Sequence, residues 1–437
     1  MQTPREICLG LLVKSEKNSS FSGIALDNTL SRNQDLSDID RRFISALYYG
    51  VIERRITLDA VIGRYSKRPI DKLSLEIKEI LRIGIYQLLY MDSVPDSAAV
   101  DESVKLAKIN NQSASGFVNA VLRSFIRDNK KLPLSGKKNH DLSIKYSCPE
   151  WLTEMWLKDY GEEVAISLLE ASLGRPPTTV RFNTCKFEAS DIVSELAKDG
   201  IEVIPSETIP DCYNLKNCGS AEKLSAYKKG MFHVQDASCQ ICAGELGATD
   251  GETVLDVCSA PGGKAFTIAE IMNDSGRVLA FDLHEKRAKL ISEGAERLSL
   301  DIISASVNNA KIFNGELPMA DRVLCDVPCS GLGVIGRKPE IKYNYKCEDV
   351  LSQFPIVQYE ILKTSSRYVK SGGTLVYSTC TLNRAENDLI AERFLSENPD
   401  FEGCTLSHFD DYKATITPAT CLYGGDGFFM AKFIRIR

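Results

Sequence analysis

Two cysteines follow short apolar runs, and their types and positions are the strongest chemical signal in the chain. Cys329 lies in the sequence DVPCS and Cys380 in YSTC. If the two preceding strands are neighbours in a parallel sheet, both thiols face one pocket. A thiolate is a strong nucleophile, so the pair, with Asp326 beside it, predicts covalent catalysis. Most single cysteines are inert core residues, and we expect this of Cys258 and Cys325.

A glycine-rich turn precedes these motifs. Residues 254–264 (VLDVCSAPGGK) run from an apolar strand into Gly262 and Gly263 and then into a helix. Glycine lets a ligand approach the backbone closely, and a helix N-terminus offers free N–H groups. A P-loop would need Gly and Ser or Thr where the chain has Cys258 and Ala265, and the turn lacks a G-x-G-x-x-G spacing. The turn therefore predicts a ligand site of another kind.

An acidic residue ends the next predicted strand. Asp282 closes the sequence VLAFD and follows Asp256 by 26 residues. In folds of this type a carboxylate at this place binds the two hydroxyls of an adenosine ribose. A helix N-cap or a solvated loop acid explains the same position equally well.

The elements around these motifs predict the fold of the C-terminal part. Apolar strands alternate with amphipathic helices, which is typical of a mostly parallel, Rossmann-like α/β sheet with helices on both faces. Ligands of such sheets bind beyond the carboxyl ends of the strands, where every motif above lies. The predicted strands are 253–257, 278–281, 322–325, 374–377 and 427–436, and the predicted helices are 265–272, 286–298, 356–369 and 388–395.

The preceding residues predict two further domains. Amphipathic runs without strand patterns indicate a helical bundle, and they span 40–62, 75–90, 98–109 and 117–126. A polar linker follows, and then short helices and strands alternate in a small α+β unit. The predicted domains are 1–140 (all-α bundle), 145–230 (α+β unit) and 231–437 (α/β domain).

Length and composition exclude several classes of protein. The chain has 437 residues, of which 43% are hydrophobic and 26% charged, as in soluble globular proteins of several domains. No apolar run reaches the roughly 18 residues of a membrane helix, and the N-terminus does not resemble a secretory signal. The 14 cysteines are scattered and expected to be reduced. We therefore predict a cytoplasmic protein with no membrane partner.

Charge is distributed unequally along the chain. Residues 1–147 carry 23 Lys and Arg against 17 Asp and Glu, whereas the remainder carries 30 against 42. A basic first third predicts a polyanionic partner such as a nucleic acid. A solvated surface would also explain an excess of this size.

The chain resembles the RNA cytosine-5 methyltransferases in four motifs, namely SAPGGK, Asp282, DVPCSG and STC. VQDASCQ at 234–240 and GGDGFFMAKF at 424–433 match the same family. Two further sequences, LRIGIYQLLYMDSVPDSAAVDESVKLAK and GFVNAVLRSF, look like the NusB-type helical RNA-binding domain. This arrangement is similar to the Sun/Fmu/RsmB type over nearly the whole chain. The resemblance implies that a monomer methylates one cytosine of 16S ribosomal RNA, either naked or in a partly assembled small subunit.

The resemblance also implies roles for individual residues. Cytosine C5 becomes nucleophilic only after a nucleophile adds to C6. The family assigns this attack to Cys380 and product release to Cys329; DNA cytosine methyltransferases use the Pro-Cys cysteine instead, so the sequence alone leaves the two thiols open. Asp326 matches the acid that contacts the pyrimidine, and Lys264 matches the active-site lysine. The implied S-adenosylmethionine site comprises Cys258, Ser259, Ala260, Pro261, Gly262, Gly263, Lys264, Asp282, Asn309 and Asp326, and no metal is implied.

Two positions depart from the family pattern. Asn309 stands where an Asp usually meets the adenine amino group, although its amide oxygen can still accept that hydrogen bond. Gly336 replaces the first of two adjacent basic residues, and Arg337 remains as a contact to RNA. The middle unit adds Arg181 and Asn183 as RNA-binding residues. Candidate phosphate contacts of the helical domain are Arg41, Arg42, Arg54, Arg55 and Arg123.

Two other functions remain open at this point. A methyltransferase acting on an exocyclic nitrogen would leave Cys380 unexplained. A NusB-like RNA-binding or assembly factor with a decayed catalytic domain would not need the intact pair of cysteines. The C-x-x-C of Cys239 and Cys242 lacks a second ligand pair and predicts no zinc site.

Overall fold

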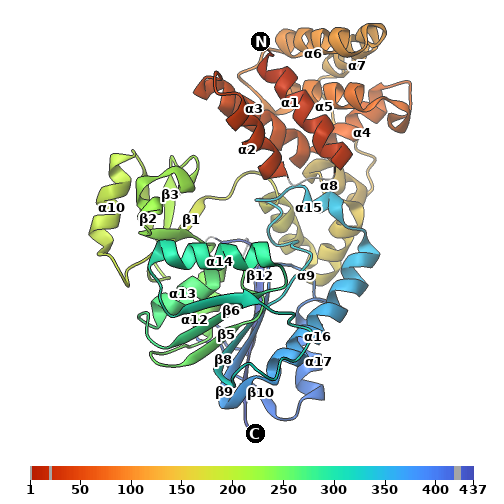
Figure 1. The fold of residues 1–437 in the computed structure, drawn as a ribbon. Helices are drawn as coiled ribbons and strands as arrows, with labels where there is room; N and C mark the ends of the chain where they lie inside the picture. The colour runs from red at the N-terminus through yellow and green to blue at the C-terminus, as the bar shows by residue number, and fades with distance from the viewer. Residues whose placement is uncertain (1, 19–21, 418–424) are drawn as a thin grey trace. The chain divides into compact units, whose positions relative to one another are not determined.

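The computed structural model describes residues 2–18, 22–417 and 425–437 (Figure 1). The chain divides into two compact units, residues 1–173 with 338–344, and residues 174–337 with 345–437. The sequence instead predicts a boundary near residue 140, because the helices between 138 and 171 follow a polar stretch. Residue 424, the first of the C-terminal family motif, lies outside the described residues.

The first unit is helical, and no strand occurs among its described residues. The predicted helix 40–62 is two helices, because the chain turns at Arg54, whose amide caps α3 by donating to Gly50 and Ile52. Gly161 interrupts α9 with a φ of 78°. The helices are α1 (Pro4–Asn18), α2 (Ser22–Arg32), α3 (Asp38–Glu53), α4 (Arg55–Tyr65), α5 (Leu75–Tyr90), α6 (Asp96–Asn110), α7 (Ser115–Arg127), α8 (Lys138–Tyr146), α9 (Glu150–Ala171) and α15 (Ile341–Asn344).

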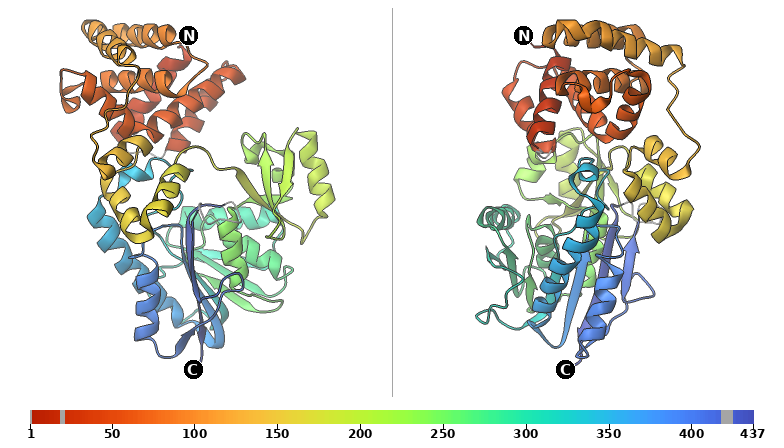
Figure 2. Two further views of the ribbon diagram at one scale, coloured as in Figure 1. Left: turned by 180° about the vertical axis from the view of Figure 1, so that it is seen from behind. Right: turned by 90° about the vertical axis from the view of Figure 1, so that its right-hand side faces the viewer.

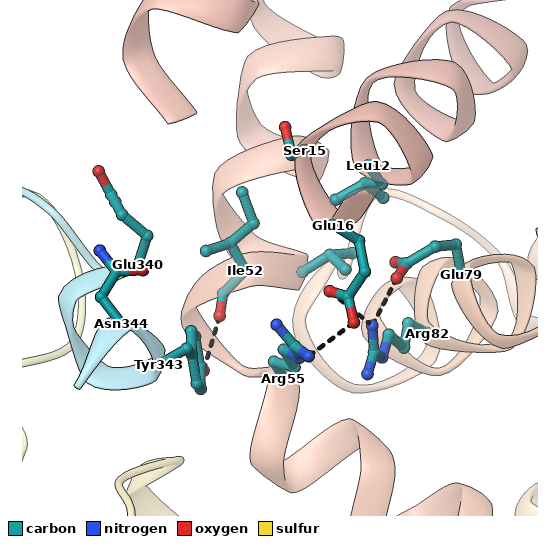
Figure 3. Close-up of a pocket in the computed structure, with 11 residues that line it drawn as sticks. Leu12, Ser15, Glu16, Ile52, Arg55, Glu79, Arg82, Glu340, Tyr343 and Asn344 are labelled. Atoms are coloured by element: carbon teal, nitrogen blue, oxygen red, sulfur yellow. Dashed lines mark hydrogen bonds and ion pairs between the residues drawn. The ribbon is translucent and has the colours of Figure 1, made fainter. Parts of the chain in front are cut away.

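A closed cluster of charges lies in this unit, at the rim of a cavity of about 320 Å³ (Figure 3). The Arg82 guanidinium is 2% exposed and donates to both carboxylate oxygens of Asp59, at 2.6 and 2.7 Å, and to Glu79. Arg55 donates to Glu16 at 2.7 Å. Each cation therefore faces a carboxylate, and the cluster joins α1, α4 and α5.

The short helix α15 enters this unit from a distant part of the sequence. Lys342 is buried and donates from Nζ to the Glu53 carbonyl at 2.8 Å, and the Tyr343 hydroxyl donates to the Ile52 carbonyl at 2.8 Å. These carbonyls are at the C-terminus of α3, where a helix leaves its last carbonyls without a full set of partners; the Ile52 carbonyl also accepts from the Arg54 amide. Burial lowers the pKa of Lys342 to about 8.

The second unit begins with a small antiparallel sheet in the order β2-β3-β1-β4. Its core holds Val180, Phe182, Ile192 and Leu196, which come from β1 and α10. The sequence patterns of residues 178–183, 190–198 and 201–204 predict β1, α10 and β2, but no pattern predicts the short strands β3 and β4. The elements are β1 (Thr178–Phe182), α10 (Ala189–Lys198), β2 (Glu202–Pro205), β3 (Cys212–Lys216) and β4 (Phe232–Val234).

The larger sheet has the order β10-β12-β9-β8-β5-β6-β7, with β11 paired to β12. The strands from β9 to β7 are parallel, and β12 is antiparallel to β9. β5 lies between β6 and β8, so the strand order reverses beside it, which is where ligands of such sheets bind. The strands are β5 (Thr253–Asp256), β6 (Arg277–Asp282), β7 (Ile303–Val307), β8 (Ala320–Asp326), β9 (Val369–Thr379), β10 (Phe401–Gly403), β11 (Lys413–Ile416) and β12 (Phe428–Arg435).

Helices cover both faces of this sheet (Figure 2). Side chains of successive strand residues point to opposite faces, so Val254 joins the core beneath α12, α13 and α14, whereas Leu255 joins the core beneath α16 and α17. The helices are α12 (Ala237–Glu245), α13 (Gly263–Ile271), α14 (Glu285–Leu298), α16 (Phe354–Ser366) and α17 (Asp388–Glu397). In the part of the chain that the structure describes, no helix has the length and apolar character to cross a membrane.

Candidate active site

The two cysteines singled out by the sequence lie side by side. Cys329 follows β8 and Cys380 follows β9, and these strands are parallel neighbours with Asp326 opposite Ser378. The two sulfur atoms are 3.3 Å apart, within hydrogen-bonding distance, and both thiols line the same cavity. The prediction that the pair faces one pocket is therefore confirmed.

The surroundings of Cys329 favour its protonated form. The hydrogen bond with Cys380 raises the pKa of Cys329 well above its usual value, and burial and the charges of Cys380, Glu386 and Asp326 act in the same direction. A thiol that keeps its proton beside another sulfur donates a hydrogen bond to it. The separation of the two sulfur atoms lets either thiol donate to the other, so a protonated Cys329 can stabilise a thiolate on Cys380.

A buried lysine, Lys264, contacts the carboxylate of Asp326 at the end of β8. Lys264, in the first turn of α13, donates from Nζ to Asp326 at 2.8 Å, and Ser378 donates to the other oxygen of Asp326 at 2.8 Å. Burial opposes the lysine's charge, but Asp326 and the thiols of Cys239 and Cys242 outweigh it and hold the pKa of Lys264 well above its usual value. The pair therefore places an ammonium and a carboxylate next to the thiols.

The cavity at this sheet edge has a volume of about 440 Å³. Asp282 ends β6 and lines it; one of its oxygens accepts from the His284 amide at 3.1 Å, and the other lies 3.3 Å from Arg287. Arg287 also donates to the Ala260 carbonyl, so it holds the glycine-rich turn next to Asp282. Of the predicted cofactor residues, the cavity is lined by Cys258, Ala260, Asp282, Asn309 and Asp326.

The other residues of the glycine-rich turn shape its backbone. The Ser259 amide donates to the Phe281 carbonyl at 2.7 Å, which joins the turn to β6. Gly262 has a φ of 111°, and a Cβ there would lie 2.4 Å from the Phe266 ring, so only glycine fits. Pro261 precedes it, and Gly263 begins α13.

Comparison with known families adds an independent test. A family model described as "16S rRNA methyltransferase RsmB/F" matches residues 243–434, a model of the NusB family matches 2–127, and a ferredoxin-like domain of RsmF/B-like methyltransferases matches 148–221. A probable ribosomal RNA small subunit methyltransferase B of Bacillus subtilis is 38% identical over 404 residues, which cover 91% of this chain and 89% of that protein. The chain belongs to the RsmB family of 16S ribosomal RNA methyltransferases.

Other relatives agree with this assignment. The corresponding Synechocystis protein is 36% identical over 92% of this chain and 91% of its own length, and ribosomal RNA small subunit methyltransferase B of Escherichia coli is 33% identical over 94% and 95%. The crystal structure of PH0851 covers 100% of this chain and 99% of its own, with a TM-score of 0.84 and 24% identity. The predicted fold class is confirmed: a helical NusB domain, a ferredoxin-like domain and an α/β methyltransferase domain.

RsmB-family enzymes use S-adenosylmethionine, and the predicted cofactor is confirmed for this chain. A solved relative, NSun6 from Pyrococcus horikoshii with SFG, shares the fold with a TM-score of 0.61 at 19% identity over 66% of this chain and 98% of its own. The cavity fits the cofactor, because its volume is sufficient and it is lined by the Asp282 carboxylate and the Asn309 amide, which the sequence predicts to meet the ribose hydroxyls and the adenine.

The three residues predicted to bind RNA have partners within the protein. Arg181 is 7% exposed and donates to Glu270 and Asp211, and Asn183 is fully buried and donates to the carbonyls of Gly230 and Leu298. In this structure neither side chain is available to RNA; both attach the ferredoxin-like sheet to the methyltransferase domain.

Arg337 is likewise engaged. Its guanidinium donates to Asp236 at 3.0 Å, to Asp426 and to the Pro177 carbonyl, so its charge is already balanced by two carboxylates. Among the candidate arginines of the NusB domain, Arg41 donates to the Leu30 and Asn33 carbonyls, whereas Arg42 and Arg123 are exposed.

Two buried carboxyl groups near the cavity were not singled out by the sequence. Asp256 ends β5 and is fully buried; burial raises its pKa to about 7, against hydrogen bonds with Ser259 and the Cys258 backbone. Glu386 follows Cys380 by six residues and is also fully buried. A G-x-G-x-x-G spacing does occur at 331–336, but in a loop of turns, so it is not a dinucleotide-binding turn.

Proposed function

We propose that the protein methylates C5 of a cytosine in 16S ribosomal RNA with S-adenosylmethionine, through a covalent bond between Cys380 and C6. The single observation that supports this most is the 3.3 Å separation of the two thiols at the cavity. A methyltransferase acting on an exocyclic nitrogen has no use for such a pair.

The first step is the attack of the Cys380 thiolate on C6. The electron pair of the C5–C6 double bond moves toward N3, where a proton from the Lys264–Asp326 pair neutralises the developing charge. C5 is then nucleophilic. S-adenosylmethionine supplies the methyl group that C5 accepts, and the base must be unpaired or flipped out of a helix to reach the thiol.

Product release uses the second thiol. Once Cys380 is bonded to carbon, its negative charge is gone, so the principal cause that raises the pKa of Cys329 is lost and this thiol ionises to solvent. The Cys329 thiolate takes the proton from C5, the C–H electron pair restores the C5–C6 double bond, and the C6–S pair returns to Cys380. The N3 proton returns to Asp326, and both thiols regain their starting states.

The proposal also covers the location of the protein, its oligomeric state and the assembly state of its RNA substrate. The relatives are bacterial proteins named for the ribosomal RNA small subunit, and we propose that this protein acts in the cytoplasm, as a monomer, on naked 16S ribosomal RNA or a partly assembled subunit. Methyl transfer to deproteinised RNA, to partly assembled particles and to mature subunits distinguishes these forms.

The decisive experiment is covalent trapping. Cys329→Ala, Cys380→Ala and the double variant are incubated with S-adenosylmethionine and with each RNA form, and denaturing gels are run; Cys404→Ala, which removes a cysteine outside the cavity, is the control. We expect an adduct in Cys329→Ala that is absent in the double variant. No adduct in any variant, together with methyl transfer that survives Cys380→Ala, would instead remove the nucleophile assignment and leave exocyclic chemistry. RNA binding without adduct or methyl transfer on any substrate would identify a binding factor.

A further inference from the structure

The residues that follow the two thiols form a second pair behind the first. Ser330 comes directly after Cys329, and Thr381 directly after Cys380; their hydroxyl oxygens are 2.7 Å apart and both residues are buried. The loop after β8 and the loop after β9 are therefore joined twice, once through sulfur at the cavity and once through oxygen beneath it.

One carboxylate collects the donors around this second pair. Glu386 is fully buried; it accepts from the Ser330 amide at 3.0 Å and from the Ser330 hydroxyl. It also accepts from Gln358 at 2.8 Å and from Asn383 at 3.0 Å. Gln358, on α16, donates in addition to the Pro328 carbonyl at 3.0 Å. Glu386 thus connects the peptide that carries Cys329 to the segment after Cys380 and to a helix.

The charge of Glu386 acts on the Cys329 thiol. The donors just described are all uncharged, so they solvate the carboxylate without neutralising it. The titratable groups that face Cys329 are Cys380, Glu386, Asp326 and Tyr345, and Lys264 lies beyond Asp326. Glu386 is among the causes that raise the pKa of Cys329, after the hydrogen bond with Cys380, burial and the charge of Cys380.

We propose that Glu386 is a positioning residue that holds the two thiols in register and keeps the shared proton on Cys329, so that Cys380 is the thiol that attacks. This inference rests on the proposed covalent mechanism and adds to it the reason why two cysteines of similar placement take different roles. Glu386 itself does not touch substrate or cofactor.

The test measures which thiol ionises first. The free enzyme, without RNA or cofactor, is labelled with iodoacetamide between pH 6 and 10. The tryptic peptide ending at Arg384 reports Cys380, and fragmentation of the peptide ending at Arg337 separates the label on Cys329 from that on Cys325. In the wild type we expect Cys380 to be labelled at lower pH than Cys329. In Glu386→Gln, loss of the charge should speed labelling of Cys329 at pH 8 about tenfold, as for a pKa lowered by one unit.

Two variants distinguish the effect of the Glu386 charge from a general effect on the stability of the fold. Glu386→Asp keeps the charge and should restore the wild-type order of labelling. Glu245→Gln removes another buried carboxylate of the same domain, which accepts from the amides of Ser407 and His408; it should destabilise the fold without changing the labelling. In methyl-transfer assays, Glu386→Gln should lower kcat by about tenfold or more, because a pKa change of about one unit alters the population of the reactive protonation state tenfold. KM for RNA should be unchanged.

Each outcome of the labelling and methyl-transfer experiments either supports or overturns the proposed role of Glu386. Earlier labelling of Cys329 than Cys380 in the wild type would overturn the proposal, even if Glu386→Gln failed to fold. Equal labelling profiles in wild type and Glu386→Gln would also overturn it while leaving methyl transfer by the wild type, and thus the proposed function, untouched. Conversely, a shifted profile in an enzyme that transfers no methyl group would support the charge effect and reject the proposed function.

Discussion

Arg82 in the helical unit and Lys264 in the methyltransferase domain are both buried cations beside carboxylates, but their surroundings differ. Arg82 faces Asp59 and Glu79, and Glu79 is buried as deeply as Arg82 itself. Lys264 faces Asp326, whose side chain is 29% exposed and lines the cavity. Asp59 is also 29% exposed, so the arrangements differ in their other partner: Arg82 has the buried carboxylate of Glu79, whereas the carboxylate that Lys264 bonds lines the cavity beside the thiols.

This difference indicates what each group contributes. A buried charge with one fully buried partner holds elements together, because removing one member leaves the other uncompensated. A buried charge whose partner reaches a cavity can act on a substrate, and its removal leaves a carboxylate that water can solvate. Charged residues line both the cavity at the Arg82 cluster and the cavity at the thiols. We expect the charges of the first to stabilise the fold and those of the second to act on a substrate.

The largest expected effect is the loss of activity in Lys264→Met. The variant removes the ammonium that holds Asp326 and supplies its proton, so methyl transfer should fall by roughly 10²–10⁴-fold, the range of general acid catalysis. The free energy of unfolding should change by less than about 1 kcal/mol, because Asp326 remains accessible to water. Turnover and urea unfolding are measured together, with the exposed Lys289→Met as control. If Lys264→Met destabilised the protein as much as an Arg82 variant does, the proposed difference between the two buried cations would be wrong.

Arg82→Met should have the opposite effect. Loss of the guanidinium leaves Glu79 buried without a cation, and burial already raises the pKa of Glu79 against the influence of Arg82. We expect a loss of about 3–5 kcal/mol in the free energy of unfolding, measured by urea denaturation, while kcat at low temperature stays near the wild-type value. The exposed Arg127→Met should cost less than about 0.5 kcal/mol. A stable Arg82→Met protein would show that the cluster is dispensable.

The buried carboxyl group of Asp256 should make the free energy of unfolding depend on pH. Burial, reinforced by the charge of Asp326, raises its pKa to about 7 in the folded protein, whereas an aspartate in the unfolded chain has a pKa of about 3.9. Between these values the folded state keeps a proton that the unfolded state has lost, so stability falls as the pH rises. The loss is on the order of 4 kcal/mol, complete above pH 7.

Asp256→Asn should remove this slope. Urea unfolding at several pH values between 4 and 8 would show the wild type weakening relative to the variant as the pH rises, and the exposed Asp301→Asn should follow the wild type. A constant difference between wild type and Asp256→Asn would mean that Asp256 is ionised throughout this range.

The smallest expected effect concerns the cofactor. In Asn309→Asp a carboxylate replaces the amide at the adenine position, and a charged acceptor forms the stronger hydrogen bond. S-adenosylmethionine should bind about three to ten times more tightly, as titration calorimetry would show. Asn308→Asp adds the same charge next to it at the cavity and should change affinity less. Unchanged affinity in Asn309→Asp would mean that this residue does not meet the adenine.

Much of this protein follows from local patterns. The alternation of strands and helices predicted the α/β domain, since side-chain periodicity reflects which face of an element is buried. The predicted helix 75–90 coincides with α5, where Ser74 caps the first turn. The motifs with cysteine, lysine and aspartate carried the resemblance to a family, and the family model and relatives confirmed it. Such features depend on neighbours in sequence, which is why the sequence by itself determined them.

The tertiary structure decided the rest. Only strand order places β8 next to β9 and brings two sulfur atoms 51 residues apart to within 3.3 Å. Arg181 and Asn183 carry the residue types of RNA contacts, but long-range packing buries them. Glu386 has no motif that marks it, because its role depends on donors that the fold collects from three separate segments. Contacts between distant residues leave no period in the sequence, and they are what turned a set of reactive side chains into a site.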